Sequence, residues 1–172
     1  IHTRKITDSC RDKDCIEDLR VYLSRSSQQI LDTAKVLHLG LAVDNEPYVV
    51  PMNYGYAMVD GKLTLYLHSA HRGKKLDMMR ANPNVFFEME SGLVPFEGDV
   101  ACRYGLAYSC LMGRGRAQKV EDVSEKKLAL ELLMKVQTGR DFSFTDKLTD
   151  AVTITRIDVS EYTAKHRPMP KR

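Results

Sequence analysis

The sequence lacks the marks of a membrane, exported or metal-dependent protein. Its longest apolar stretches are far shorter than the ~20 residues that a membrane helix requires. The first fifteen residues contain no hydrophobic stretch of the kind found in export signals. The four cysteines form no C-x-x-C pair and no zinc-ligand spacing. We therefore expect a cytoplasmic protein with reduced thiols and no membrane contact, and metal binding is only a weak alternative.

A strong charge of either sign is also absent. The net charge is +3 over 172 residues, which is too small to indicate binding to nucleic acid. No repeat, low-complexity segment or linker divides the chain. With 43% apolar and 28% charged residues, the composition is that of a globular protein. A chain of this length can bury roughly two-thirds of its unfolded surface, so it needs no disulfide or metal to fold.

Hydrophobic patterning predicts a β-rich region that begins near residue 36. Asp60-Gly61 separates two of the predicted strands, and this dipeptide is a strong signal for a two-residue hairpin. In the strand after the turn, Leu63, Leu65 and Leu67 share one face. The predicted strands cover residues 36–43, 47–59, 62–68, 85–90, 108–120 and 151–157, with a continuation of the last to residue 164.

Helices are predicted on either side of these strands and between them. The predicted helices are two short ones in residues 12–35 with a break at residues 24–27, one at residues 71–80, and one that Asp122 and Glu125 begin and Gly139 ends. Strands connected in series favour an antiparallel arrangement, so we predict a mainly β protein with flanking helices, folded as a six-stranded barrel. As one domain, it would comprise N-terminal helices (residues 1–35), the barrel (residues 36–165) and a mobile tail (residues 166–172).

The segment from His68 to Lys75 carries the clearest chemical signal. It places a serine at the end of a strand, a glycine in a loop and two lysines at the start of a helix. The unpaired N–H groups and the dipole of a helix N-terminus favour a phosphate. Lys74 and Lys75 add positive charge, and Ser69 adds a neutral donor. By itself, the segment fits a phosphate site and a solvated basic helix start about equally well.

Four motifs occur in a fixed order around this segment. They are V-P-M-N-Y-G-Y at residues 50–56, D-G at 60–61, H-S-A-H-R-G-K-K at 68–75 and N-P-N-V at 82–85. Their order and spacing resemble the FMN-binding split-barrel superfamily, which includes pyridoxamine 5′-phosphate oxidase, and are closer to its nitroimidazole-resistance (Nim) branch. The resemblance runs from about residue 36 to residue 134 and more weakly to residue 157. The C-terminal arginine motif of the oxidase branch is not matched, so oxidation of vitamin B6 is not implied.

The resemblance implies an FMN-binding split barrel that forms a homodimer with FMN at the subunit interface. The phosphate would lie on Ser69, Gly73 and the two lysines, while the stretch from Pro51 would run alongside the flavin. The implied cofactor-binding residues are Pro51, Met52, Asn53, Tyr54, His68, Ser69, Gly73, Lys74, Lys75, Ser109 and Cys110.

His68 is our candidate catalytic residue. It lies on the strand face opposite the three leucines, so we interpret it as lining the flavin site; an inert surface position is the alternative. An imidazole there could donate a hydrogen bond or a proton to a reduced substrate, and His71 is a second candidate. Asn53 is unusual within a strand, which favours a hydrogen bond to the cofactor.

The first functional hypothesis is an FMN-dependent oxidoreductase. It would pass electrons from a reduced nicotinamide to a small acceptor such as a nitro-aromatic compound. The alternative is a flavin- or haem-binding carrier or sensor without turnover, with His68 or His71 as a haem ligand, and a deazaflavin in place of FMN is a third option. These hypotheses depend on the resemblance, because a fold by itself does not define a function.

Overall fold

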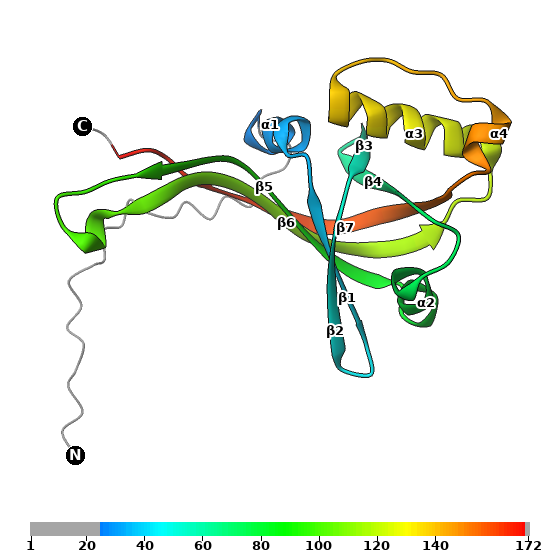
Figure 1. Cartoon of the computed structure of the whole chain (residues 1–172), viewed down its shortest axis with the longest axis horizontal. Helices are drawn as coiled ribbons and strands as arrows, with labels where there is room; N and C mark the ends of the chain where they lie inside the picture. Colours follow the sequence, from blue (N-terminus) through cyan, green and yellow to red (C-terminus); the bar gives the residue numbers. More distant parts are fainter. Residues whose placement is uncertain (1–24, 171–172) are drawn as a thin grey trace.

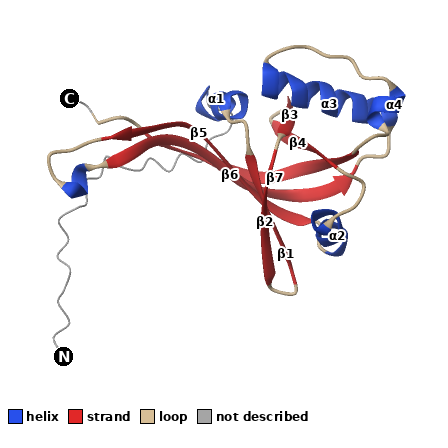
Figure 2. Ribbon diagram, in the orientation of Figure 1, coloured by secondary structure: helices blue, strands red, loops and turns tan. Residues whose placement is uncertain are grey.

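The computed structural model describes residues 25–170 as one seven-stranded antiparallel sheet with helices packed on it (Figures 1 and 2). The prediction of a mainly β protein with flanking helices is confirmed. None of the helices in residues 25–170 combines the length and the hydropathy that crossing a bilayer would take. The strands are β1 (Leu37–Val43), β2 (Glu46–Met52), β3 (Tyr54–Val59), β4 (Lys62–Ser69), β5 (Asn84–Phe96), β6 (Gly105–Lys119) and β7 (Thr153–Arg167). The helices are α1 (Arg25–Thr33), α2 (Lys74–Ala81), the 3-10 turn η1 (Ala101–Arg103), α3 (Val123–Thr138) and α4 (Asp146–Thr149).

The two edges of the sheet are joined by a single residue. The strand order is β2-β1-β5-β6-β7-β4-β3, so β2 and β3 are the edge strands, and only Asn53 separates them in the chain. Because neighbouring Cα atoms are ~3.8 Å apart, the two edges come together at this corner. The sheet therefore curls toward itself, but it is not closed into the predicted barrel, since no ladder joins β2 to β3 within residues 25–170.

The predicted count of six strands is wrong, because residues 47–59 form two strands rather than one. The chain breaks at Asn53, whose side-chain amide donates to the backbone oxygen of Lys35 (3.1 Å) and to Oε1 of Gln137 (3.0 Å). These bonds tie the corner to the segment after α1 and to α3. Hydropathy is similar on both sides of Asn53, so the pattern alone did not reveal the corner.

The helix boundaries also differ from the prediction at two places. Residues 25–27, predicted to be part of a break, are helical in α1; Ser27 is fully buried within the helix, and this packing outweighs its weak helix propensity. The other helix predicted in residues 12–35 lies outside the described residues. Helix α2 begins at Lys74 rather than at residue 71, because Gly73 has a φ of 146° that a helix cannot contain.

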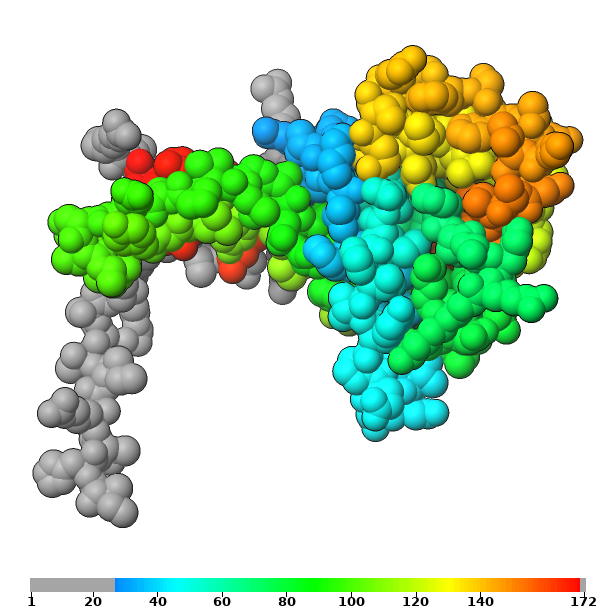
Figure 3. All heavy atoms as spheres, in the orientation of Figure 1, coloured from blue at the N-terminus to red at the C-terminus, as the bar shows by residue number. Residues whose placement is uncertain are grey.

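Strands β5, β6 and β7 extend beyond their predicted ends. Residues 91–108, which we call the arm, project from the body of the sheet (Figures 1 and 3). In the arm β5 and β6 remain paired across a bulge. The first pair is Ser91 with Ser109, and the last is Phe96 with Gly105. β7 continues to Arg167, so the first two residues of the predicted tail are paired with β6.

Strand β4 is buried on both faces. Leu63, Leu65 and Leu67 are at most 2% exposed in the main core, so the prediction that they share one face is confirmed, and this face is buried. On the opposite face Tyr66 is 6% exposed and belongs to a second core cluster under α3. Gly55 of β3 lies opposite Tyr66 in the ladder. The backbone of α3 packs so closely on Gly55 that a Cβ there would clash with it.

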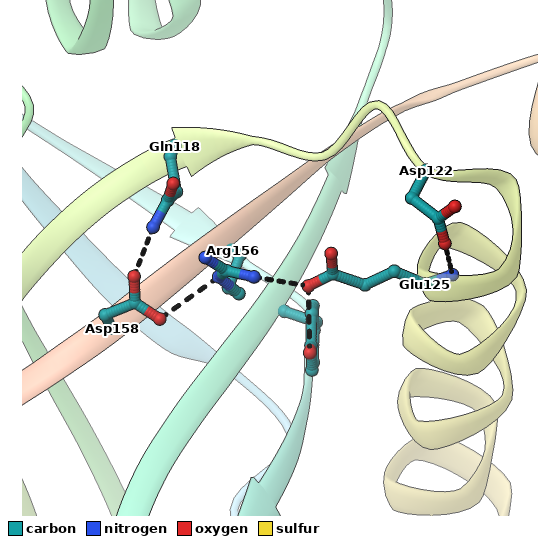
Figure 4. A network of polar contacts seen from close by, with 6 residues as sticks. Gln118, Asp122, Glu125, Arg156 and Asp158 are labelled. Atoms are coloured by element: carbon teal, nitrogen blue, oxygen red, sulfur yellow. Dashed lines mark hydrogen bonds and ion pairs between the residues drawn. The ribbon is translucent and has the colours of Figure 1, made fainter.

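Helix α3 is held in place by a cap and by a polar network. Asp122 accepts a hydrogen bond from the backbone N–H of Glu125 (2.8 Å), and Gly139 ends the helix with a φ of 73°, as predicted. The Glu125 carboxylate accepts from Arg156 (2.9 Å), which also lies 3.1 Å from Asp158 (Figure 4). Because Arg156 of β7 is paired with the Glu125 carboxylate of α3, the network fits a structural role that joins α3 to β7.

Candidate functional site

The loop between β4 and α2 folds back onto β7. Ser69 ends β4 opposite Thr153, and its hydroxyl donates to the backbone oxygen of Ala70 (3.0 Å). Nδ1 of His71 lies 3.1 Å from the hydroxyl oxygen of the buried Thr153. These contacts give residues 68–75 one defined path from the strand to the helix.

The N-terminus of α2 is exposed and uncapped. Gly73 takes the N-cap position with a φ of 146°, which residues with a side chain rarely adopt, and no side chain of the described residues caps the helix. The Gly73 carbonyl accepts from the N–H groups of Leu76 (2.9 Å) and Asp77 (3.2 Å). The N–H groups of Lys74 and Lys75 have no acceptor within the helix. Together with the lysine charges, they form a place where an anion can bind.

His68 lies beside this helix start and is half-buried. Its Nδ1 atom is buried, and no hydrogen-bond partner for it occurs among the described residues. Burial lowers the pKa of His68, and the positive charge of Lys75 lowers it further. A buried polar atom without a partner is rare and unfavourable unless a ligand or water completes its bonds. His68 is therefore a neutral imidazole near Lys75, with one ring nitrogen free to form a hydrogen bond with a ligand or water.

We expect the pKa of His68 to lie below its ordinary value of 6.5. Because the folded state binds this proton less readily than the unfolded chain, the stability that neutral His68 contributes is present above 6.5. It is lost as the pH falls from there through the folded-state pKa. A titration of the imidazole by NMR checks the shift, and His68→Gln should flatten the pH dependence of the unfolding free energy in that range. A midpoint at or above 6.5 would contradict the prediction.

The predicted flavin-side segment separates into exposed and buried parts. Pro51 is exposed, and Met52 is half-buried in the main core. The Asn53 amide is bonded to Lys35 and Gln137 as described above. Tyr54 is fully buried and donates to the backbone oxygens of Leu31 (2.9 Å) and Ala34 (3.2 Å), and this burial raises its pKa. The side chains of Asn53 and Tyr54 thus already hold α1 and α3 in place.

Ser109 and Cys110 of β6 make separate polar contacts, Ser109 with β7 and Cys110 with β5 and, through it, β1. The Ser109 hydroxyl lies 2.9 Å from Nδ1 of His166. The buried Cys110 thiol donates to Oε1 of Glu88 (3.2 Å), and Oε2 of Glu88 lies 3.2 Å from Nδ1 of His38. Burial and the Glu88 carboxylate raise the pKa of Cys110 to about 12. Cys110 is therefore a protonated thiol at neutral pH.

We expect Cys110 to resist alkylation at pH 8 while the folded protein is intact. Only on the order of 10⁻⁴ of the thiol would be thiolate at that pH, and the thiolate is the reactive form. The exposed Cys102 serves as an internal reference. Peptide mass spectrometry after a timed iodoacetamide pulse should find Cys102 modified first, with Cys110 reacting only after denaturation. Equal rates at the two cysteines in the folded protein would contradict the assignment.

The predicted site residues fall into two distant groups in one chain. His68 pairs with Ile154 on β7, whereas Cys110 pairs with Lys165, eleven positions further along the same strand. At a rise of ~3.3 Å per residue, this separation is on the order of 35 Å. The structure thus brings His68, Ser69, Gly73, Lys74 and Lys75 together and places Ser109 and Cys110 too far away to touch the same flavin-sized ligand.

Two neighbouring residues were not predicted from the sequence. Tyr48 of β2 lies under the Lys74 ammonium, 4.8 Å from Nζ to the ring centroid, and Thr153 bonds to His71. Both are far from residues 68–75 in the sequence, and no local pattern links them to it. Within residues 25–170, no group of three or more His, Cys, Asp or Glu side chains is arranged to hold a metal ion.

Comparisons with known proteins agree with this fold. The family model for pyridoxamine 5′-phosphate oxidase matches residues 24–166. A candidate 5-nitroimidazole antibiotic resistance protein from Bacteroides thetaiotaomicron is 30% identical, with 88% of each chain covered and a TM-score of 0.72. A FAD-binding protein from Mesorhizobium loti is 26% identical, covering 85% of this chain and 96% of that one, with a TM-score of 0.59. A flavocytochrome from Azotobacter vinelandii shares the fold at 18% identity, with 87% and 70% covered and a TM-score of 0.68. Among curated proteins, none matches this sequence.

Proposed function

Because the chain belongs to the pyridoxamine 5′-phosphate oxidase family, we propose that it is an FMN-dependent oxidoreductase that passes electrons from a reduced nicotinamide to a small acceptor such as a nitro-aromatic compound. The observation that carries this proposal is the junction of β4 and α2. An uncapped helix N-terminus, two lysines and an unpartnered histidine nitrogen meet there. When bound, FMN would supply the redox chemistry, and the protein would supply binding, orientation and electrostatics.

The first turn of α2 would hold the flavin phosphate. The free N–H groups of Lys74 and Lys75 and the Lys75 ammonium are donors to a dianionic phosphate. Ser69 would contribute its hydroxyl, which now donates to the backbone oxygen of Ala70. Gly73 leaves the approach open, since no atom of residues 25–170 lies within 4 Å of the place where its Cβ would be.

His68 would act at the flavin or at an acceptor bound beside it. Its lowered pKa keeps the imidazole neutral at pH 7, so one ring nitrogen can donate a proton while the other accepts one. Nδ1 has no protein partner among the described residues and is the atom that would face the ligand. This arrangement suits hydrogen bonding or proton transfer to a reduced substrate.

The relatives support the choice of cofactor and acceptor. The Bacteroides protein is described by resistance to 5-nitroimidazoles, which supports a nitro-aromatic acceptor. The other two are described as FAD-binding and as a flavocytochrome, which supports a flavin but leaves FAD as the cofactor to test against FMN.

Titration of the purified protein with FMN, FAD and haem tests the cofactor. We expect a yellow protein that binds FMN and quenches its fluorescence, with weaker binding of FAD. A Soret band on addition of haem would favour the alternative of a haem-binding carrier. Failure to bind either flavin would overturn the proposal.

Anaerobic reduction of the bound flavin tests turnover. NADH or NADPH should bleach the flavin absorbance, and a nitro-aromatic compound should restore it with consumption of the acceptor. A protein that binds FMN tightly but shows neither half-reaction would be a carrier or sensor rather than an enzyme.

We further propose a homodimer with the flavin at the subunit interface. The two groups of predicted site residues are on the order of 35 Å apart in one chain, and a second copy could bring its Ser109 and Cys110 to this chain's α2. The arm supports this arrangement because a two-stranded ribbon gains little stability by itself. Its exposed large apolar side chains are Leu93, Val94, Val100, Tyr104 and Leu106, which are 37–56% exposed.

Light scattering on the full chain tests the dimer. Leu93→Asp in the arm should shift the protein toward monomer and weaken FMN binding, because it places a charge in an apolar contact. Leu148→Asp on α4 is the matched control, since Leu148 is 52% exposed and Leu93 is 49% exposed. A wild-type monomer that binds FMN fully would contradict the interface.

A further inference from the structure

The two lysines at the start of α2 lie against different neighbours. Lys75 is close enough to His68 to lower its pKa. Lys74 instead places its Nζ 4.8 Å from the centroid of the Tyr48 ring on β2. The two ammonium groups therefore have different neighbours from the sheet.

Tyr48 is well anchored, whereas Lys74 is not. The tyrosine is half-buried, packs against the main core and lies opposite Leu41 in the β1–β2 ladder. Lys74 is exposed, and no hydrogen bond or ion pair of its side chain is seen among the described residues. An exposed lysine has many rotamers, and holding it in one place before a ligand arrives reduces the entropy lost on binding.

Helix α2 is tied to the β1–β2 hairpin at both of its ends. At the start, Lys74 contacts Tyr48. At the end, the Asn82 amide donates to the backbone oxygen of Ala42 (2.9 Å), and Ala42 follows Leu41, the ladder partner of Tyr48. The position of the Lys74 ammonium is thus set by the same hairpin that positions the whole helix.

We propose that Tyr48 is a positioning residue for anion binding: its ring holds the Lys74 ammonium beside the free N–H groups of α2, ready for a phosphate monoester. The inference rests on the proposed function, because FMN is the ligand through which it is tested. A cation over an exposed aromatic ring changes an equilibrium by about two- to fivefold, and this is the effect expected on the dissociation constant of FMN.

A double-mutant cycle with FMN separates this role from a purely structural one. Tyr48→Leu should weaken FMN binding about two- to fivefold. Tyr48→Phe keeps the aromatic ring and should therefore retain wild-type affinity. In the Lys74→Met background, Tyr48→Leu should have no further effect, because the ring would have no ammonium to hold. Tyr162→Leu is the matched control: Tyr162 is another half-buried tyrosine packed on the same core, and its replacement should leave FMN binding unchanged.

The outcomes are distinct. Additive effects of the Tyr48 and Lys74 variants, or equal losses in the Leu and Phe variants, would overturn the role of Tyr48 while leaving FMN binding intact. Failure of the wild-type protein to bind FMN would overturn the proposed function and this inference together. Unfolding temperatures of all variants show whether a loss of affinity reflects a damaged fold.

Discussion

Lys75→Ala is expected to weaken FMN binding by about 1–3 kcal/mol, roughly 5- to 150-fold, because the variant removes a charge-assisted hydrogen bond. Lys75 stands in the first turn of α2, where the helix N-terminus already favours an anion, and beside His68. Loss of the Lys75 charge should therefore directly weaken binding of the FMN phosphate. Fluorescence titration of FMN gives the dissociation constant. The difference in affinity between the variant and the wild type should shrink as ionic strength rises.

Lys62→Ala is the matched control for this prediction. Lys62 is exposed at the opposite end of β4, and its replacement changes the net charge of the protein by the same amount. The control variant should bind FMN within about twofold of wild type, the scale of a screened, distant charge. If Lys75→Ala also stays within that range, Lys75 has no part in the site and the phosphate must bind elsewhere.

Gly55→Ala is expected to destabilise the fold by about 3 kcal/mol, at the upper end of what overpacking costs. A Cβ at Gly55 would lie 2.4 Å from the backbone nitrogen of Leu133 and 2.7 Å from the Leu132 carbonyl carbon. These are backbone atoms in the middle of α3, which a side-chain rotation cannot move away. The helix would have to lift from β3, so the unfolding temperature should fall by roughly 6–12 °C.

Gly40→Ala provides the comparison, since Gly40 is also a strand glycine. Its added Cβ would come no closer than 3.4 Å to the Phe86 carbonyl oxygen, which is ordinary contact. We expect a change within about 1 kcal/mol, and in the stabilising direction, because alanine loses less backbone entropy on folding. Calorimetry or denaturant unfolding of the two variants separates the steric effect from the general effect of removing a glycine. Equal stability of both would show that α3 does not pack as tightly on Gly55 as its backbone contacts require.

Local signals in the sequence were sufficient for several elements. Asp60 and Gly61 have positive φ angles of 50° and 76°, as the predicted two-residue turn requires. Asp122 and Gly139 bound α3 through contacts that depend only on nearby residues. The Leu63, Leu65 and Leu67 row is buried because a period-two pattern places all three on one face. In each case the cause lies within a few positions along the chain.

The errors have a different cause. The corner at Asn53 depends on bonds to Lys35 and Gln137, which are 18 and 84 positions away. The burial of Ser27 and the length of the arm likewise depend on what packs or pairs with them, which hydropathy over a short window does not contain. At such positions tertiary contacts outweigh the helix or strand propensity of the residue.

The candidate site shows the same division. The run from His68 to Lys75 could be predicted because a strand end, a glycine and a helix start are consecutive, and the helix N-terminus follows from backbone chemistry alone. Its direction, its neighbours and the unpartnered His68 nitrogen were decided by the sheet. β4 lies beside β7, which brings Thr153 to His71, and α2 lies beside the β1–β2 hairpin, which brings Tyr48 to Lys74. The β6–β7 ladder places Ser109 and Cys110 near the far end of β7. The sequence by itself determined the features that depend on consecutive residues, such as the helix N-terminus with its glycine and lysines. Which distant residues share a site depends on long-range strand pairing, and only the tertiary structure contains that pairing.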